Sequence, residues 1–313
     1  MRCPTLHELP APPDGKTGWP WTIESPALPE HQADGTPWPK ITIVTPSFNQ
    51  AETIEETIRS VLLQGYPALE YIIMDGGSAH QVTDIIEKYR PWLSHYESGP
   101  DGGQAAGINK GLSLATGVLV NWVNSDDFLQ PRALHKIALS YGLTKAELLV
   151  GQRVFRNSAG DHFTQQNWQS QWDAFAFGLA DFPQEATFFS LDLFRRIGGL
   201  DPKMVYMFDT EFFNRCLKAV DHLACISAEI SIMTINADIK TIRTDARKLQ
   251  ERAIVQASLP QGLSSKLFQL FKRLRVSAAY VRLMQAFGIG KPVYNVSFNV
   301  NTETWDADRL IMP

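Results

Sequence analysis

The fold class is most apparent in TIVTPSFNQAETIEETIRSVLLQGYPALEYIIMDGGS, residues 42–78. It begins and ends with apolar, β-branched runs, and Pro46 stops the first of them. Between the runs, apolar residues recur at helical spacing, and Gly65 ends that segment. A strand, a helix and a second strand in this order predict a βαβ unit whose strands are parallel and buried on both faces.

The same alternation continues along the chain. Further helices are predicted at 82–92, 102–117 and 209–220, and further strands at 118–124 and 223–235. Residues 185–201 read as a strand and a helix, and the segment after 150 as a short hairpin or loop. Two more helices are predicted at 241–257 and 263–287. We therefore expect an α/β fold with a mostly parallel central sheet flanked by helices and a helical C-terminal extension over 241–313.

Residues 1–39 form an arm rich in proline and tryptophan. Proline lacks an N–H group and fixes φ, so we expect little regular structure there. A disordered arm would be poor in aromatic residues. Trp19, Trp21 and Trp38 therefore predict that the arm packs onto the body of the protein.

Composition excludes several classes of protein. The net charge of −4 over 313 residues gives no global case for a nucleic-acid partner. The three cysteines match no metal spacing or disulfide framework, which favours a reducing compartment. No run of about 18 apolar residues exists, and the first residues lack the apolar core of a signal peptide. We expect a cytoplasmic protein.

Polar residues end three of the predicted strands, at 45–49, 75–78 and 124–127. In an open α/β sheet, ligands bind in the crevice beyond the carboxyl ends of the strands, so these residues are expected to converge there. Neither a dinucleotide fingerprint nor a Walker loop is present. Any phosphate bound in this crevice must therefore be held by groups other than a glycine-rich loop.

Two adjacent acids, Asp126 and Asp127, follow the strand predicted at 118–124. Their carboxylates repel each other unless a cation lies between them. Mg²⁺ and Mn²⁺ prefer oxygen ligands and bind through one or two carboxylates together with substrate phosphates. The alternative is a capping role at a turn or at a helix beginning near Pro131.

Residues 40–240 resemble an inverting family 2 glycosyltransferase with the GT-A (nucleotide-diphospho-sugar transferase) fold. The matching motifs, in order, are the opening stretch, then GINKGLSLATG, NSDD, QEATFFSLDLFRRIGGLD and FDTEFF. The resemblance implies a nucleotide-binding half, 40–150, and an acceptor half, 151–240. It also implies sugar transfer from a nucleotide-diphosphate donor, with a UDP-sugar favoured, to a saccharide or lipid-linked acceptor in polysaccharide biosynthesis.

The resemblance assigns roles to individual residues. Asp127 would coordinate a divalent cation, Mn²⁺ or Mg²⁺, while Asp126 would contact that cation or the ribose. Asp75 would bind the nucleobase, and Lys110 could offset diphosphate charge, although an exposed helix lysine is commonly only solvated. The remaining residues implied to line the donor site are Thr45, Pro46, Phe48 and Ser125.

The catalytic base implied by the resemblance is Asp209, which would deprotonate the acceptor hydroxyl in one in-line displacement with inversion. An aspartate at the start of a helix is also a common N-cap. If Asp209 only caps the helix, its neighbour Glu211 becomes the candidate base.

Several positions depart from the family's pattern. Ala79 and Ala106 stand where relatives commonly carry other residues, an acid in the second case, and Asn236 stands where relatives often have a histidine. These changes leave two other functions open. One is a protein that binds a sugar nucleotide but transfers little, and the other is a sugar nucleotidyltransferase, which would normally show a glycine-rich loop after the first strand.

The segment 264–288 mixes basic and apolar residues at helical spacing. Such a helix can lie on an anionic membrane surface, which would give peripheral contact at the inner face of the membrane. Packing of the same helix against the catalytic domain is the alternative.

Overall fold

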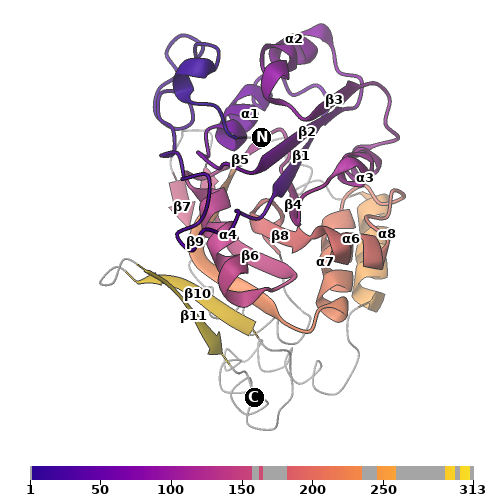
Figure 1. The fold of residues 1–313 in the computed structure, drawn as a ribbon. Coiled ribbons are helices and arrows are strands. Elements are labelled where there is room, and N and C mark those ends of the chain that lie inside the picture. The colour runs from indigo at the N-terminus through magenta and orange to yellow at the C-terminus, as the bar shows by residue number, and fades with distance from the viewer. Residues whose placement is uncertain are drawn as a thin grey trace.

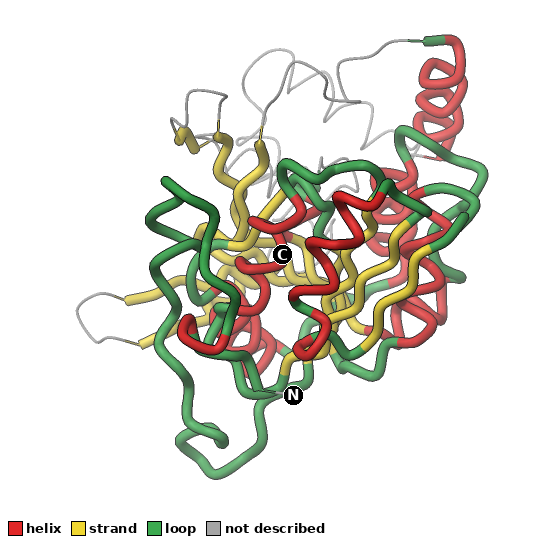
Figure 2. The backbone as a smooth tube through the Cα atoms, turned by 90° about the horizontal axis from the view of Figure 1, so that it is seen from above, coloured by secondary structure: helices red, strands yellow, loops and turns green. Residues whose placement is uncertain are grey.

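The computed structural model describes residues 2–156, 162–164, 182–234, 245–258, 293–299 and 304–310. Within these residues the strands join into one curled sheet with helices on both faces (Figures 1 and 2). The sheet order is β11-β10-β9-β6-β8-β4-β1-β2-β3, and two short strands, β5 and β7, pair beside this path.

The first half of the sheet is parallel, as predicted. Its strands are β1 (Ile41–Ser47), β2 (Leu69–Asp75), β3 (His95–Ser98) and β4 (Leu119–Trp122), with β1 between β2 and β4. The connecting helices are α1 (Ile54–Leu62), α2 (His80–Lys88) and α3 (Gln104–Leu114). Ser47 lies opposite Asp75 in the register of β1 and β2, so these strands end at the same level.

The second half contains a reversal that the sequence analysis did not predict. Strand β8 (Thr187–Ser190) runs antiparallel to both of its neighbours, β4 and β6 (Leu148–Arg156). Beyond it, β6 pairs in parallel with β9 (Leu223–Thr234) and forms the predicted hairpin with β7 (His162–Thr164). The short strand β5 (Asp127–Leu129) pairs with β9 and so ties the two halves together.

The C-terminal part is helical only in part. Helix α8 (Ala246–Ser258) matches the helix predicted at 241–257, whereas the helix predicted at 263–287 lies outside the described residues. The chain then returns as β10 (Val293–Asn299) and β11 (Thr304–Leu310). Because β10 pairs with β9, these strands extend the sheet, and the prediction of a wholly helical extension needs this correction.

Two apolar layers enclose the sheet. On one face, α3, α6 (Leu191–Ile197), α7 (Phe208–Ala219) and α8 pack around Trp122, the last residue of β4. In Figure 1 the last three of these helices lie together on one side of the molecule. On the other face, α1, α2, α4 (Ala133–Thr144) and the N-terminal arm form the second layer. Gly111 of α3 allows close approach to the sheet, because a Cβ there would lie 2.6 Å from a methyl group of Val44.

The N-terminal arm packs onto α1 through a fully buried arginine. The Arg59 guanidinium donates hydrogen bonds to the carbonyl oxygens of Pro10 at 2.8 Å, Pro20 at 3.1 Å and Trp21 at 2.9 Å. Trp19 of the arm donates from Nε1 to a carbonyl oxygen of β5 at 2.8 Å. The predicted packing of the tryptophan-rich arm is therefore confirmed.

Replacing Arg59 with methionine is expected to lower the free energy of unfolding by about 3–5 kcal/mol. The thioether keeps the side-chain volume but leaves three buried carbonyl groups without donors, and such losses are costly in a protein interior. Urea denaturation measures the change. Arg252→Met on the exposed face of α8 is the matched control. Equal stability of the two variants would contradict the anchoring role.

A buried carboxylate closes the opposite, amino end of the parallel strands. Glu70 of β2 accepts hydrogen bonds from Lys40 Nζ at 2.8 Å, from the Thr42 hydroxyl at 2.7 Å, and from both N–H and hydroxyl of Thr116 at 2.7 and 2.6 Å. Burial alone would raise the pKa of Glu70, but these hydrogen bonds outweigh it and lower the pKa to about 2.

This lowered pKa predicts a specific acid sensitivity. The stabilisation is fully present above the ordinary pKa near 4.5 and is lost as the pH falls towards 2. Wild type should therefore exceed Glu70→Gln in stability by on the order of 2–3 kcal/mol at pH 7, and the gap should narrow below pH 4.5. Denaturation at pH 7, 4.5 and 3 checks this, with exposed Glu87→Gln as control. A gap independent of pH would contradict it.

Candidate functional site

The predicted crevice lies where the parallel strands β4, β1 and β2 end. Val44 of β1 pairs with Trp122 of β4, and Ser47 pairs with Asp75 of β2, so the three polar segments leave the sheet side by side. The Ser125 hydroxyl of the third segment is hydrogen-bonded to the side chain of Gln50, which follows β1. The structure thus brings together the segments that the sequence analysis assigned to one site.

Asp75 organises the turn after β2. It is 2% exposed, and its Oδ2 accepts hydrogen bonds from the backbone of Gly77 at 3.2 Å and of Ser78 at 2.9 Å, and from the Ser98 hydroxyl at 2.6 Å. Its Oδ1 accepts one hydrogen bond, from the Ser78 hydroxyl. Because a carboxylate oxygen has two acceptor sites, Oδ1 keeps one for a ligand.

The other residues predicted at the nucleobase pocket differ in exposure. Thr45 is fully buried, and its hydroxyl lies 3.0 Å from the hydroxyl of Tyr71. Pro46 is also buried, as part of β1. Phe48 is 62% exposed, and a Cβ added at Gly76 would lie 3.3 Å from its ring. Of these three side chains, the aromatic ring of Phe48 is the one that is exposed to solvent.

The acidic pair sits in a turn between β4 and β5. The Asp127 N–H donates to the carbonyl of Asn124 at 3.1 Å, and the Asp127 carbonyl accepts from the Thr57 hydroxyl of α1 at 2.7 Å. Asp127 begins β5, while the N-cap of the following helix, α4, is Arg132. The alternative that this aspartate caps the helix after Pro131 is therefore not supported.

Asp127 is an energetically unfavourable carboxylate in the absence of a cation. It is 5% exposed. Burial raises its pKa well above the ordinary value, and the neighbouring carboxylates of Asp126 and Glu185 raise it further. A divalent cation would remove this penalty by compensating the negative charge.

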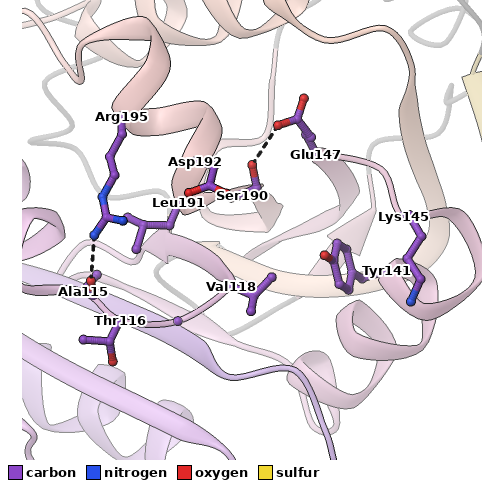
Figure 3. A pocket seen from close by; sticks show the side chains of 11 residues that line it. Ala115, Thr116, Val118, Tyr141, Lys145, Glu147, Ser190, Leu191, Asp192 and Arg195 are labelled. Carbon is purple, nitrogen blue, oxygen red and sulfur yellow. Dashed lines mark hydrogen bonds between the residues drawn. The ribbon is translucent and has the colours of Figure 1, made fainter. Parts of the chain in front are cut away.

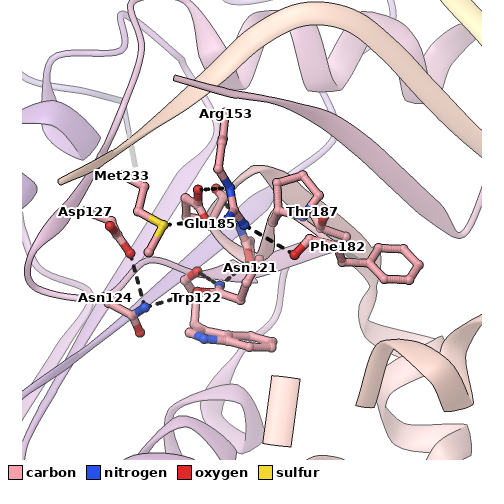
Figure 4. Close-up of polar contacts among 11 residues, drawn as sticks. Asn121, Trp122, Asn124, Asp127, Arg153, Phe182, Glu185, Thr187 and Met233 are labelled. Carbon is pink, nitrogen blue, oxygen red and sulfur yellow. Dashed lines mark hydrogen bonds and ion pairs between the residues drawn. The ribbon is translucent and has the colours of Figure 1, made fainter. Parts of the chain in front are cut away.

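A hydrogen-bonded network holds the turn between β4 and β5 that carries the acidic pair (Figure 4). Asn124 Nδ2 donates to Asp127 Oδ2 and to Gln184 Oε1, both at 3.2 Å, and its Oδ1 accepts from Gln104 of α3 at 2.9 Å. Gln184 in turn donates to the carbonyl of Trp122 at 2.6 Å. The orientation of Asp127 is thus tied to the end of β4 and to the second half of the chain.

A buried ion pair extends this network, and its arginine was missed by the sequence analysis. Arg153 of β6 lies 2.8 Å from Glu185, between Nε and Oε1, and also donates to the carbonyl of Phe182 at 3.3 Å. Asn121 of β4 donates to the Glu185 carbonyl at 3.1 Å. Asn121, a polar residue inside an apolar buried strand, indicates that a polar partner lies nearby, but that partner is the Glu185 backbone and not Arg153.

Helix α7 carries the two candidate bases and docks on β4. Rings of Phe208 and Phe213 pack against Trp122, with centroids 6.3 and 5.7 Å away. Asp209 is the second residue of the helix, the N-cap being Met207, and its carboxylate accepts from the N–H of Thr210 at 2.6 Å. The start of α7 therefore lies against the strand that leads into the acidic pair.

Glu211 is engaged in a bidentate ion pair. Its oxygens lie 2.6 and 2.7 Å from Nε and Nη2 of Arg215, which also donates to the carbonyls of Ile197 at 2.7 Å and Gly199 at 2.6 Å. Arg215 thus links α7 to the end of α6. This arrangement gives Glu211 a structural role.

Lys110 and Asn109, adjacent on α3, have different partners. Lys110 is half-exposed and pairs with Glu97 of β3. Asn109 donates to the carbonyl of Leu200 at 2.8 Å and accepts from its N–H at 2.9 Å, which fastens α3 to the turn after α6.

The donor set fits Mg²⁺ or Mn²⁺ in combination with a phosphate ligand. Asp126 and Asp127 supply adjacent carboxylates, and the burial of Asp127 together with the repulsion between the two favours a cation. Within the described ranges, no group of three or more His, Cys, Asp or Glu side chains is placed to hold a metal. The pair would therefore bind the ion together with oxygens of a diphosphate, as is common for Mg²⁺. Asn236 lies outside the described residues.

A second hollow, of about 490 Å³, lies at the amino end of β4, next to Val118 (Figure 3). Charged side chains at its rim include Lys145, Glu147 and Arg195. None of the residues predicted to act on donor or acceptor lines it. Since ligands of open α/β sheets bind at the carboxyl ends of strands, the crevice described above is the stronger candidate site.

Of the helices in the described part of the chain, none is long and apolar enough to cross a bilayer. The basic segment 264–288 lies outside the described residues, so its predicted contact with a membrane stays a prediction.

Comparison with known proteins identifies relatives of this chain. Residues 42–197 match the family described as Glycosyl transferase family 2. A glycosyltransferase of Mycobacterium tuberculosis is 30% identical over 188 residues, which cover 56% of this chain and 68% of that protein. The GalNAc(5)-diNAcBac-PP-undecaprenol beta-1,3-glucosyltransferase of Campylobacter jejuni is 29% identical over 104 residues, or 31% of this chain and 32% of that enzyme.

A solved structure shares the fold. The crystal structure of S. aureus TarS in complex with UDP-GlcNAc aligns with a TM-score of 0.58 at 16% sequence identity. The alignment covers 79% of this chain and 71% of that one. The predicted nucleotide-diphospho-sugar transferase architecture is therefore confirmed.

Proposed function

Because this chain belongs to glycosyltransferase family 2, we propose that it moves a sugar from a nucleotide-diphosphate donor to an acceptor hydroxyl with inversion. The observation that carries the proposal is the arrangement of three carboxylates. Asp126 and Asp127 follow β4, and Asp209 opens the helix that packs on Trp122, the last residue of that strand. This arrangement supports the proposal that a site for a leaving diphosphate and a base lie at the same strand end.

The donor would bind to the nucleotide-binding half, residues 40–150. Phe48 offers an exposed ring for stacking on a base, and Asp75 keeps one acceptor site for a base N–H. We propose a UDP-sugar as donor, a choice supported by the UDP-GlcNAc bound in TarS. When bound, a divalent cation held by Asp126 and Asp127 would act as a Lewis acid for the departing diphosphate.

The residues of this chain would then carry out a single displacement. Asp209 accepts the proton of the acceptor hydroxyl while the hydroxyl oxygen forms a bond to the anomeric carbon. The bond from that carbon to the diphosphate oxygen breaks, and the electron pair leaves with the nucleoside diphosphate. Attack from the face opposite the leaving group inverts the anomeric configuration. Asp209 is favoured over Glu211 because Arg215 occupies both oxygens of Glu211.

The acceptor would bind to the second half, residues 151–240. We propose a saccharide or lipid-linked acceptor, as in polysaccharide biosynthesis, supported by the undecaprenol-linked substrate in the name of the Campylobacter jejuni relative. Peripheral membrane contact through 264–288 would suit such an acceptor. Liposome flotation of the chain with and without residues 264–313 tests this contact, and equal sedimentation of both would remove it.

A donor screen tests the proposed function most simply. Release of nucleoside diphosphate from UDP-, GDP- and dTDP-sugars is measured with and without Mn²⁺. We expect release from at least one donor, with UDP-sugars preferred and with dependence on the metal. Binding of a donor without release under any condition would favour a sugar-nucleotide-binding protein that transfers little.

A further inference from the structure

A buried carboxylate on the C-terminal helix holds the loop that leads into α7. Glu251 of α8 is 4% exposed. Its Oε1 accepts a hydrogen bond from the N–H of Val205 at 2.8 Å, and its Oε2 accepts from the N–H groups of Tyr206 at 2.8 Å and Met207 at 3.0 Å. One side chain therefore satisfies three successive backbone donors.

The carboxylate is suited to this role because it stays charged. Burial alone would raise the pKa of Glu251, but the hydrogen bonds from the three backbone N–H groups outweigh burial and hold the pKa below its ordinary value. Hydrogen bonds to an ionised acceptor are stronger than neutral ones. The interaction should therefore fix the backbone of the loop firmly.

Two further residues, Asp245 just before α8 and Arg247 on it, hold the same loop. The hydroxyl of Tyr206 donates to Asp245, and Arg247 Nη2 donates to the carbonyl of Lys203 at 2.7 Å. Arg247 also lies 3.4 Å from Glu251 and orients it. We call Asp245, Arg247 and Glu251 the α8 clamp.

The loop held by the α8 clamp ends at the N-cap of α7. That N-cap is Met207, whose side chain offers no capping hydrogen bond. Helix starts normally use a polar N-cap side chain to satisfy free N–H groups. Here Glu251, about forty residues further along the chain, satisfies the N–H groups leading into the helix.

Asp209 lies two residues beyond the clamped loop. The α8 clamp fixes residues 205–207 before it, and Phe208 and Phe213, which precede and follow it in the chain, pack against Trp122. The position of the Asp209 carboxylate relative to β4 therefore depends on both anchors.

We propose that Glu251 is a positioning residue for the transfer reaction, which it supports by fixing the loop 205–207 and thereby the orientation of Asp209. This inference rests on the proposed role of Asp209 as the base. It assigns the C-terminal helix a part in catalysis, although that helix lies outside the span matched to the family, 42–197. A displacement of about 1 Å at a reacting group can cost 10²-fold in rate, so the loss of one anchor should be measurable.

The test is Glu251→Gln in the full-length chain. The amide keeps the size of the side chain but replaces one acceptor oxygen with an NH₂ group, which faces a backbone N–H without forming a bond. We expect kcat to fall about 10- to 100-fold, while the Kd for UDP with Mn²⁺ stays unchanged. Turnover is measured as UDP release from the donor selected in the screen above. Arg252→Gln, exposed on the same helix, is the matched control and should leave kcat unchanged.

A double-mutant cycle separates positioning of Asp209 from a general loss of stability. If Glu251 acts through Asp209, Glu251→Gln should reduce the turnover of Asp209→Asn no further. An unchanged kcat in Glu251→Gln overturns the proposal. It is also overturned if Glu251→Gln lowers the kcat of Asp209→Asn by as large a factor as it lowers that of the wild type. If Asp209→Asn alone turns over like the wild type, Asp209 is not the base. The single variant therefore reveals a failure of the proposed function separately from a failure of the positioning role of Glu251.

A milder variant keeps the proposal testable if Glu251→Gln does not fold. Arg247→Met removes the hydrogen bond to the carbonyl of Lys203 and the charge beside Glu251. It should lower kcat less than Glu251→Gln does, again with unchanged UDP affinity. An Arg247→Met variant with wild-type kcat would count against the α8 clamp.

Discussion

Asp209→Asn is expected to bind the donor nucleotide with wild-type affinity and to lose turnover by about 10²–10⁴-fold, the usual contribution of a general base. The amide keeps the shape of the side chain and can still accept a hydrogen bond from the N–H of Thr210. It cannot accept the proton of an acceptor hydroxyl at neutral pH. Steady-state kinetics together with calorimetric titration of UDP and Mn²⁺ measure both quantities.

Two further variants show whether the effect is specific to Asp209. Asp221→Asn changes an exposed aspartate just beyond the other end of α7 and should leave turnover unchanged. Glu211→Gln breaks the ion pair with Arg215, so it should lower stability more than it lowers kcat per folded molecule. Full turnover by Asp209→Asn together with an inactive Glu211→Gln would transfer the role of base to Glu211.

Asp127→Asn should have two effects of opposite sign. Without metal, the variant should be as stable as the wild type or more stable, because burial and neighbouring carboxylates disfavour the charged form of Asp127. With Mn²⁺ and donor, turnover should fall by about 10²–10³-fold, since stabilisation of leaving-group charge by a bound metal contributes several kcal/mol. Thermal melts with and without Mn²⁺ and UDP, combined with kinetics, record both effects.

The control for this variant is Asp192→Asn. Asp192 is an exposed carboxylate that lines the hollow at the amino end of β4, so its loss should change neither the response to Mn²⁺ nor turnover. Identical Mn²⁺ dependence of UDP binding in wild type and Asp127→Asn would show that the acidic pair does not hold the cation.

Local patterns in the sequence were sufficient to predict β1, β2, α1 and α7. Each combines a periodic apolar pattern with a clear stop, such as Gly65 after α1. The short strands β3 and β5 were not predicted, because three or four residues carry too little periodicity to distinguish them from loops. The same holds for the antiparallel direction of β8, which depends on where the chain crosses the sheet and not on its own sequence.

The candidate site, like the fold, could be predicted from the sequence only in part. The approach of Asp75, Asp126 and Asp127 to one crevice followed from the rule that parallel strands end at one edge of the sheet. The hydrogen-bond and ion-pair partners of these residues could not be predicted from the sequence. Arg153 and Glu251 act through contacts with residues 29 to 46 positions away, and pairings at such distances leave no periodic pattern in a single sequence.

The exposure of side chains was equally hard to predict. Thr45 and Phe48 were both expected at the nucleobase pocket, yet the Thr45 hydroxyl contacts Tyr71 in the interior and the ring of Phe48 is open to solvent. Side chains alternate between the two faces of a strand, so Thr45 lies on the same face as Ile43, towards α1. A residue just beyond the strand, such as Phe48, is free of this alternation.

The central claim is a single displacement in the crevice beyond β4, and the anomeric configuration of the released sugar tests it most directly. Slow hydrolysis of a donor whose sugar is α-linked to the diphosphate is followed by proton NMR before the free sugar equilibrates. We expect the β anomer to accumulate first, at a rate that depends on Mn²⁺ and falls in Asp209→Asn. Release of the α anomer first would contradict the single displacement.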